Sequence, residues 1–303
     1  MKLAIIGSTG QLGVDLVQAA KKAALEVVAV TGRSQLDIAD GGAVARFLSD
    51  VRPDVLINTA AFHNVDLCEK EPQEAYRVNT LAVAGLARAC ESGKILLIQV
   101  GTDYVMEGAP DNRPLPETAR PQPKSIYAVT RYGGDMMTLA HAPGFGYVVR
   151  TCGLFGMAGC KLKGGLNFVD TMVAAARAGK TLRVVSDQIV APTATDELAG
   201  QLLELVRVRP GPGLYHAVSH GACSWHEFAT SALQLAGIHV PIEAVSSGAF
   251  AAPAIRPNYS VLDNARLRTA GLDRMGDWQS ALARFVRTKY GGHQAGELSG
   301  TGR

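Results

Sequence analysis

Short runs of apolar residues alternate with helical patterns along the first half of the chain. The apolar runs occupy residues 3–6, 26–30, 54–60, 95–100 and 147–149. A first helical pattern passes through Leu12 and Leu16, and others lie near residues 42–50 and 72–91. Because each connecting helix must bury its apolar face on the sheet, this alternation is typical of parallel strands covered on both faces. We therefore predict an α/β fold built on a doubly wound parallel sheet.

Composition narrows the classes of function. The 303 residues are 47% hydrophobic and 19% charged, as expected of a globular protein with a sizeable core. The net charge is only +3 and the basic residues form no long run, which argues against a nucleic-acid partner. No apolar run approaches the length of about 18 residues that a membrane helix needs, and no signal segment precedes the first strand. We expect a cytoplasmic protein with no membrane partner.

The histidines and cysteines do not indicate metal chemistry. The five cysteines show neither a C-x-x-C pair nor a zinc-like spacing, so we expect reduced thiols. His216 and His220 are four residues apart, a spacing that would suit zinc on a helix. The surrounding residues instead predict a strand that leads into a loop, where the two imidazoles do not share a face. We predict no metal site from these residues.

Residues 7–13, GSTGQLG, lie between the first predicted strand and the first predicted helix. In such a turn Gly7 permits the tight bend, Gly10 lets the backbone approach a pyrophosphate, and Gly13 lets the helix pack close to the strand. The N-terminus of the helix adds N–H groups and a partial positive charge. A turn that needs glycine only for packing is the alternative. The position after the first strand favours dinucleotide binding in a Rossmann-type domain.

The pattern changes after residue 151, where a glycine-rich stretch precedes a helix near residues 167–178. Further on, Ser224 and Glu227 have the spacing of a capping box. The predicted domains are then an NAD(P)-binding Rossmann-type domain (residues 1–151, about 190–218 and about 260–290), a smaller C-terminal substrate domain (about 152–189 and 219–259) and a mobile tail (291–303).

The end of the second predicted strand bears on the choice of cofactor. Sites for NAD usually carry an acidic residue about 20 residues beyond the glycine turn, where it bonds the ribose 2′-hydroxyl. Thr31 and Gly32 occupy that place here, and Arg33 and Ser34 follow. The Arg33 guanidinium and the Ser34 hydroxyl would both donate to a 2′-phosphate, which favours NADPH over NADH. The alternative for Arg33 is a solvated loop cation.

Three side chains near the fourth predicted strand indicate carbonyl reduction. Thr102 follows that strand, at the edge of the sheet where ligands collect. Tyr127 and Arg131 lie four residues apart on a predicted helix and share a face. A nearby cation favours the phenolate of a tyrosine and so tunes it as an acid–base group. Beside a nicotinamide, Tyr127 would protonate the carbonyl oxygen, Thr102 would hydrogen-bond it, and the cofactor would deliver hydride to carbon.

Together these motifs resemble the dTDP-4-dehydrorhamnose reductase family of the extended short-chain dehydrogenase/reductase superfamily. The resemblance reaches about residue 290 and rests on these segments: GSTGQLG (7–13), LDI (36–38), NTAAFHNVDLCEKEP (58–72), VNT (78–80), TDYVMEG (102–108), YAVTRYGGD (127–135), VVRTCGLFG (148–156), NF (167–168), SDQIVAPT (186–193) and RPNYSVLD (256–263). It implies NADPH-dependent reduction of the 4-keto group of a nucleotide-linked deoxysugar, with dTDP-4-dehydrorhamnose as substrate and dTDP-L-rhamnose as product.

The resemblance also implies roles for single residues. Thr102 and Tyr127 would be catalytic, with Asp103 and Tyr104 beside the sugar. Around the cofactor would lie Gly7, Gly10, Gln11 and Leu12 at the pyrophosphate, Asp37 and Ile38 at the adenine, and Ala60 and Ala61 at the adenosine ribose. Val65 would contact the sugar. The diphosphate of the nucleotide sugar has candidate cations in Arg256, Lys161, Lys163 and Arg183, for which a solvated surface is the alternative.

Two departures from the family pattern leave other functions open. Arg131 stands in place of the lysine of Y-x-x-x-K, and its planar fork is not equivalent to an ammonium group. Gly153 stands where the family usually carries an aromatic residue, which would loosen the sugar pocket. One alternative is a catalytically weak, NADP-binding regulatory subunit, like the subunit of methionine adenosyltransferase that resembles this family. Another is a sugar-nucleotide epimerase or dehydratase, with Asp103 as an added acid. A Mg²⁺ requirement and a homodimer also stay open.

Overall fold

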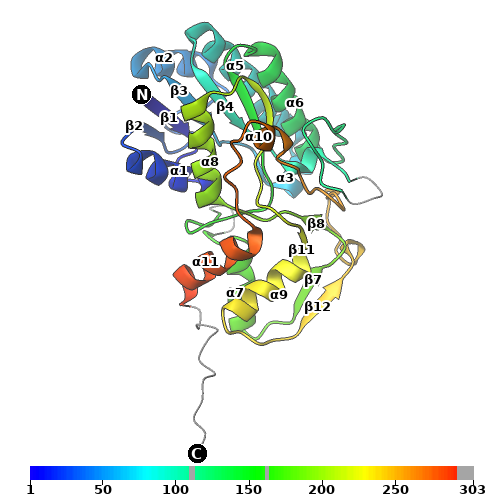
Figure 1. Cartoon of the computed structure of the whole chain (residues 1–303). Coiled ribbons are helices and arrows are strands. Elements are labelled where there is room, and N and C mark those ends of the chain that lie inside the picture. Colours follow the sequence, from blue (N-terminus) through cyan, green and yellow to red (C-terminus); the bar gives the residue numbers. More distant parts are fainter. Residues whose placement is uncertain (109–112, 161–163, 292–303) are drawn as a thin grey trace, which may run out of the picture.

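The computed structural model describes residues 1–108, 113–160 and 164–291. Figure 1 shows a larger part, in which helices flank a sheet, and a smaller part beside it. The sheet contains β1 (Lys2–Ile6), β2 (Glu26–Val30), β3 (Val55–Asn58), β4 (Leu96–Val100), β5 (Gly146–Arg150) and β10 (Gly213–His216). These strands are all parallel, in the order β10-β5-β4-β3-β1-β2. The predicted α/β class and doubly wound parallel sheet are confirmed.

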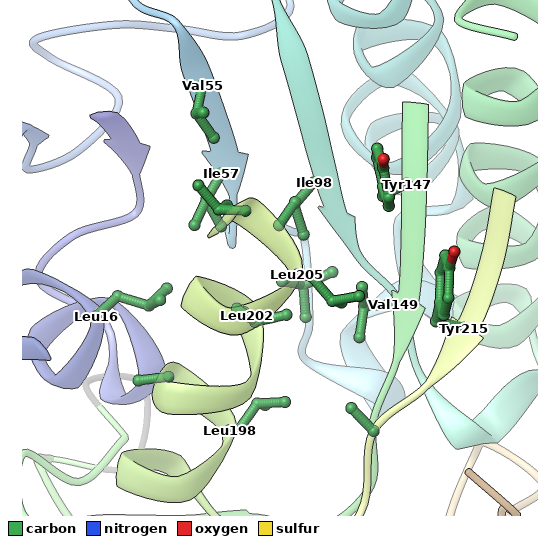
Figure 2. Close-up of a cluster of buried hydrophobic side chains, with 14 of the residues drawn as sticks. Leu16, Val55, Ile57, Ile98, Tyr147, Val149, Leu198, Leu202, Leu205 and Tyr215 are labelled. Atoms are coloured by element: carbon green, nitrogen blue, oxygen red, sulfur yellow. The ribbon is translucent and has the colours of Figure 1, made fainter. Parts of the chain in front are cut away.

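Helices cover both faces of the sheet. Those on one face are α1 (Gln11–Lys22) and α8 (Thr195–Val208), and those on the other are α2 (Gly41–Val51), α5 (Ala82–Gly93) and α6 (Ile126–His141). Figure 2 shows leucines of α8, among them Leu202 and Leu205, beside Ile98 and Val149 of the strands. Because both faces of each strand are buried, the central strands are apolar at successive positions rather than at alternate ones.

The strand order reverses between β1 and β3. Strand β2 pairs with one edge of β1, and β3 pairs with the other. The carboxyl ends of β1 and β3 therefore lie side by side, with Ile6 opposite Asn58. In open parallel sheets, ligands bind in the crevice outside the carboxyl ends of the strands at such a reversal.

A helical connection leads from β3 to β4. It consists of α3 (Val65–Lys70), α4 (Pro72–Tyr76) and a π-helical turn, η1 (Arg77–Leu81), which continues into α5. The sequence predicts one regular helix near residues 72–91, and the structure widens it at η1. Within this turn the Asn79 amide bonds both backbone groups of Phe62, accepting from its N–H at 2.8 Å and donating to its carbonyl at 3.0 Å. The π-helical turn thus holds the segment that follows β3.

The smaller part has its own apolar core. Its helices are α7 (Phe168–Arg177), α9 (Trp225–Leu235) and α11 (Trp278–Tyr290). Its short strands pair as β6 (Leu154–Phe155) with β9 (Thr193–Ala194), β7 (Leu182–Val185) with β12 (Ile242–Val245), and β8 (Ile189–Val190) with β11 (Cys223–Ser224). Ser224 and Glu227 form the predicted capping box of α9, and Asn167 and Asp170 form a second one at α7. A 3₁₀ turn, η4 (Ser247–Ala249), follows β12.

The sequence analysis assigns residues 260–290 to the domain that contains the sheet. Helix α11 instead packs against the smaller part. Leu267, on the short helix α10 (Ala265–Thr269), does pack in the core beside the sheet. Leu282 and Phe285 of α11 instead share a cluster with Phe228 of α9, because their apolar face meets the core of the smaller part. The division into a cofactor domain and a substrate domain stays a prediction. Of the predicted tail, residues 292–303 lie outside the described residues.

Candidate active site

The glycine turn after β1 brings α1 close to the sheet. Gly7 has φ of +79°, and a Cβ there would lie 2.5 Å from Thr59 Oγ1. A Cβ on Gly13 would lie 2.2 Å from the Gly7 carbonyl oxygen. Gly10 precedes the first residue of α1 and offers no side chain to cap the helix. The backbone N–H groups at the start of α1, at Gln11 and Leu12, are therefore suited to an anionic group in the crevice.

Gln11 joins α1 to the smaller part. Its side-chain Nε2 donates to the Leu154 carbonyl at 3.0 Å. Its Oε1 is buried and has no hydrogen-bond partner among the residues that the structure describes. A buried polar atom without a partner is costly, so this oxygen is suited to a donor on a bound group. Gln11 thus lies where both parts of the chain border the crevice.

A cavity of about 200 Å³ opens beside the glycine turn. The residues that line it are Ile6, Gly7, Gly32, Arg33, Leu36, Asp37, Ile38, Ala60, Ala61, Phe62, Glu74 and Val78. Five of them, Arg33, Asp37, Ile38, Ala60 and Ala61, are the side chains predicted to surround the adenosine. Sequence reasoning missed Phe62, Glu74 and Val78, although all three belong to segments that carry the family resemblance or lie beside one. Ser34 is exposed and is not among the lining residues.

Two carboxylates pair with Arg33. Arg33 Nε lies 2.8 Å from Asp37 Oδ2, and its Nη1 lies 3.1 Å from Glu74 Oε1. The end of β2 carries no acid, as the sequence shows, but Glu74 comes from α4, and sequence reasoning did not bring it to this place. Bonds from Arg77 hold the pKa of Glu74 below its usual range. Burial works to raise the pKa of Asp37, but the Ala39 N–H and the Arg33 guanidinium outweigh it and lower the pKa.

Tyr127 lies at the start of α6. The Ser125 side chain accepts from the Ala128 N–H at 3.2 Å and so fixes where the helix begins. The Tyr127 side chain is 9% exposed, and its ring meets that of Tyr104 edge to face, with centroids 5.4 Å apart. Thr102, two residues beyond the end of β4, lies close enough to the Tyr127 hydroxyl to lower the pKa of the phenol. The predicted pair of hydroxyl groups is therefore assembled.

Burial dominates the acidity of Tyr127. It raises the pKa of the phenol, while the Arg131 charge and the Thr102 side chain lower it by less. The sequence predicts a cation that favours the phenolate. The cation is present, but the phenol stays protonated at neutral pH because removal from water outweighs it. A protonated Tyr127 is the form that can donate a proton.

Arg131 is buried one turn after Tyr127, as predicted from their spacing. One of its terminal nitrogens, Nη2, donates to the Val100 carbonyl at the end of β4. Its charge also lowers the pKa of Asp135, which burial raises and which is paired to Arg150. The guanidinium is thus held against the sheet, and its predicted contact with the nicotinamide ribose stays a prediction.

Asp103 is turned into a buried hydrogen-bond network. It lies in the short 3₁₀ turn η2 (Asp103–Val105) and is 3% exposed. Its carboxylate accepts from Ser260 Oγ at 2.6 Å, Cys152 Sγ at 3.1 Å and Thr102 Oγ1 at 3.3 Å. Burial raises its pKa, and the Ser260 and Cys152 bonds offset part of that rise. Sequence reasoning missed Ser260, although the RPNYSVLD segment that carries it was noted.

The predicted sugar-contacting residues gather around Tyr104. Val65, at the start of α3, and Tyr104 pack in one cluster with Tyr127. Arg256 Nη2 lies 2.9 Å from Asp66 Oδ2, and the Arg256 charge lies close enough to Tyr104 to lower the pKa of that phenol in part. Burial raises the pKa of Tyr104 well above its usual value. The structure therefore brings Val65, Tyr104 and Arg256 to one side of Tyr127, and Asp66 is a partner that the sequence did not reveal.

Other candidates are less central. Gly153 has φ of +50°, and a Cβ there would lie 3.3 Å from the Trp225 ring, so Trp225 fills part of the space that the missing aromatic residue leaves. Arg183 pairs with Glu243 at 3.2 Å on the exposed β7–β12 pair. The predictions for Lys161 and Lys163 lie outside the described residues.

The described residues contain no group of three or more His, Cys, Asp or Glu side chains that could hold a metal. His216 Nδ1 lies 3.1 Å from the Leu115 carbonyl, and burial lowers its pKa to about 3. His220 instead lies 3.0 Å from Asp273. Over the same part of the chain, no helix combines the length and hydropathy needed to cross a membrane.

Comparison with known proteins identifies the family. Residues 1–290 match the model of the RmlD substrate binding domain. The dTDP-4-dehydrorhamnose reductase of Streptomyces griseus is 36% identical over 92% of this chain and 90% of its own. The spore coat polysaccharide biosynthesis protein SpsK of Bacillus subtilis is 35% identical over 95% of this chain and 98% of its own. The chain belongs to the dTDP-4-dehydrorhamnose reductase family.

A solved structure agrees with this family in fold. The dTDP-4-dehydrorhamnose reductase of Bacillus anthracis, in complex with NADP, superposes with a TM-score of 0.89 and 30% identity. The match covers 95% of this chain and 99% of that one. Family membership and the Rossmann-type fold confirm two of the sequence predictions, and the family is one of oxidoreductases by name. The roles of single residues are not tested by this likeness.

Proposed function

We propose that the protein reduces the 4-keto group of a dTDP-linked deoxysugar with NADPH, and that dTDP-4-dehydrorhamnose is the substrate. The observation that carries the proposal is Tyr127, a buried phenol that lies beside Thr102 and one helical turn before the buried Arg131. It stands beside a crevice with a glycine turn and an adenosine-sized cavity. The names of the relatives, and the NADP bound in one of them, support the choice of substrate and cofactor.

The chain offers fitting groups for the cofactor at both ends of the crevice. The N–H groups of Gln11 and Leu12, and the close approach that Gly7 and Gly13 allow, suit a pyrophosphate. The apolar walls of the cavity suit an adenine, and the unpartnered Gln11 Oε1 suits a donor. When bound, the nicotinamide supplies hydride to the carbonyl carbon. Among the described residues, no group of three or more His, Cys, Asp or Glu side chains could hold Mg²⁺.

The chain's own residues then handle the proton and the sugar. Tyr127 donates its proton to the developing oxyanion, and Thr102 orients the Tyr127 hydroxyl and the carbonyl oxygen. Arg131 stabilises the phenolate that remains after the transfer, because its guanidinium stays charged at any working pH. Val65 and Tyr104 contact the sugar, and Arg256 binds the diphosphate of the nucleotide.

Asp103 argues against the dehydratase alternative. A dehydratase needs an acid that reaches the substrate, whereas Asp103 faces Ser260, Cys152 and Thr102 in the protein interior. The regulatory-subunit alternative depends on whether Arg131 supports turnover. Thr102 and Tyr127, which match the catalytic residues of the family, are both present and favour an enzyme.

The decisive experiment follows NADPH oxidation by the purified protein with a panel of dTDP-4-keto-6-deoxysugars, with product identified by mass spectrometry. We expect turnover with dTDP-4-dehydrorhamnose. Binding of NADPH without turnover of any sugar in the panel would refute the reductase and leave the regulatory subunit.

A further inference from the structure

Four charged side chains form a network at the cavity beside the glycine turn, and three of them, Arg33, Asp37 and Glu74, line it. Arg33 bonds Asp37 and Glu74, at 2.8 and 3.1 Å. Arg77 donates two hydrogen bonds to the same Glu74, from Nε to Oε2 at 2.7 Å and from Nη2 to Oε1 at 2.8 Å. Its Nη1 lies 3.6 Å from Asp37 Oδ2. Glu74 Oε1 therefore accepts from both guanidinium groups, and the two cations and two anions neutralise each other.

The network is reachable from the cavity. Arg33, Asp37 and Glu74 all line it, whereas Arg77 stands behind Glu74 at the start of η1. The side chains are partly exposed, 65% for Arg33, 28% for Glu74 and 34% for Arg77. Exposed pairs of this kind contribute little energy and exchange partners readily. A stronger anion at this position can therefore replace a carboxylate.

We propose that Glu74 competes with the 2′-phosphate of the cofactor for Arg33, and that Arg77 is the second cation that binds this phosphate. The proposal rests on the proposed function, which places the adenosine in this cavity. A phosphate monoester carries about two negative charges and three acceptor oxygens, so it takes over the donors that Glu74 now occupies. With NADH, Glu74 and Asp37 keep their partners and accept from the ribose 2′-hydroxyl.

The network therefore sets the balance between the two cofactors. Free arginines would favour NADPH strongly, and free carboxylates would favour NADH. Because Glu74 neutralises both arginines, the preference for NADPH is reduced and NADH also binds. Of this network, the sequence analysis names only Arg33 and Asp37.

The test measures cofactor affinity by calorimetry, independently of any sugar. Glu74→Gln should bind NADPH about fivefold more tightly, because an exposed like charge is removed, while NADH affinity stays within about twofold. Arg77→Ala should weaken NADPH by about fivefold and leave NADH nearly unchanged. Glu204→Gln is the matched control, since Arg207 on α8 grips Glu204 with the same two distances, 2.7 and 2.8 Å, away from the cavity. It should change neither affinity.

Unchanged NADPH affinity in a folded Glu74→Gln protein would overturn the proposal, as would an equal gain for NADH. Thermal melting checks the fold, and Glu74→Ala replaces the variant if Glu74→Gln does not fold. Failure of the proposed function gives other results. If the wild type binds neither cofactor, both proposals fall. If the Glu74 effect is present but no 4-keto sugar is reduced, this proposal stands and only the reductase assignment fails.

Discussion

The two ends of the crevice hold their charges in different ways. At the end proposed to hold the adenosine, Arg33 and Glu74 belong to a partly exposed network in which opposite charges neutralise each other. At the end proposed to be catalytic, Tyr127, Asp103 and Arg131 are 9%, 3% and 6% exposed. These groups are held by hydrogen bonds to hydroxyl, thiol and backbone groups rather than by ion pairs in water.

The difference predicts where substitutions matter. Charges in water are screened, so a change at the adenosine end alters selectivity by small factors. When a buried polar group loses its hydrogen-bond partner, no water molecule can take the partner's place. The full free-energy cost of the unsatisfied group then lowers stability or activity. The effects of substitutions should therefore fall along the crevice, from Tyr127 to Glu74. Four predictions test this gradient.

The largest effect is expected for Tyr127→Phe, which removes the proton donor and keeps the ring. Sugar reduction should fall by about 10²–10⁴, the usual contribution of a general acid, while NADPH affinity stays within about twofold. Steady-state kinetics and calorimetry on the same preparation check both. Tyr132→Phe is the control, since Tyr132 lies on the same helix and contacts Arg150 instead. A variant at position 127 that reduces the sugar at the wild-type rate would show that Tyr127 is not the acid.

The next effect concerns Arg131. Arg131→Ala removes a buried cation and its bond to the Val100 carbonyl, so both rate and NADPH binding should fall. A misplacement of about 1 Å in the reacting groups can cost roughly a hundredfold in rate, which is the loss we expect. Arg131→Lys keeps the charge and restores the family's Y-x-x-x-K, so it should be active and at least as fast as wild type. If Arg131→Lys binds NADPH but does not reduce the sugar, a positive charge at position 131 is not sufficient to support the reaction, and this prediction fails.

The fold and several residues that line the cavity were predictable because their signals are local. Parallel strands buried on both faces leave apolar runs, and the glycine turn between the first strand and helix is recognised directly from its spacing. Ala60 and Ala61 follow β3 directly, and Asp37 and Ile38 belong to the LDI motif beyond β2, so local motifs locate all four, and the structure places them around one cavity.

The missed features join segments that are far apart in the sequence. Ser260 bonds Asp103 across 157 residues, and Arg256 bonds Asp66 across 190. No local pattern reveals such a partner. The Glu74 carboxylate that pairs with Arg33 was missed for the same reason, since it lies 41 residues further along the chain. Trp225, at the start of α9, likewise reaches Gly153 from a distant part of the sequence. The sequence therefore indicates many residues of the candidate site, but it does not indicate the hydrogen-bond and ion-pair partners of those residues.

The third prediction compares two serines. Ser260→Ala removes the shortest hydrogen bond to the buried Asp103 carboxylate and should lower the free energy of unfolding by about 1–3 kcal/mol. Ser34→Ala, at the exposed adenosine end, should change it by less than about 0.5 kcal/mol. Denaturant unfolding of both variants measures the difference. Equal losses at the two positions would remove the proposed contrast between the ends of the crevice.

The smallest effect is the stability that Glu74 contributes. Its pKa is lowered, chiefly by the Arg77 bonds, so it lies below the value of about 4.3 expected in the unfolded chain. A carboxyl whose folded pKa is depressed stabilises the protein above its unfolded pKa, and that contribution is lost as pH falls through the folded pKa. Because the network is partly exposed, Glu74→Gln should cost at most about 1 kcal/mol at neutral pH and low salt. Denaturant unfolding at neutral pH and below about pH 4 should show the cost shrinking in acid, and added salt should reduce it at neutral pH. A loss that is larger than this and insensitive to both acid and salt would mean that Glu74 is held as tightly as Asp103, and the two ends of the crevice would then be alike.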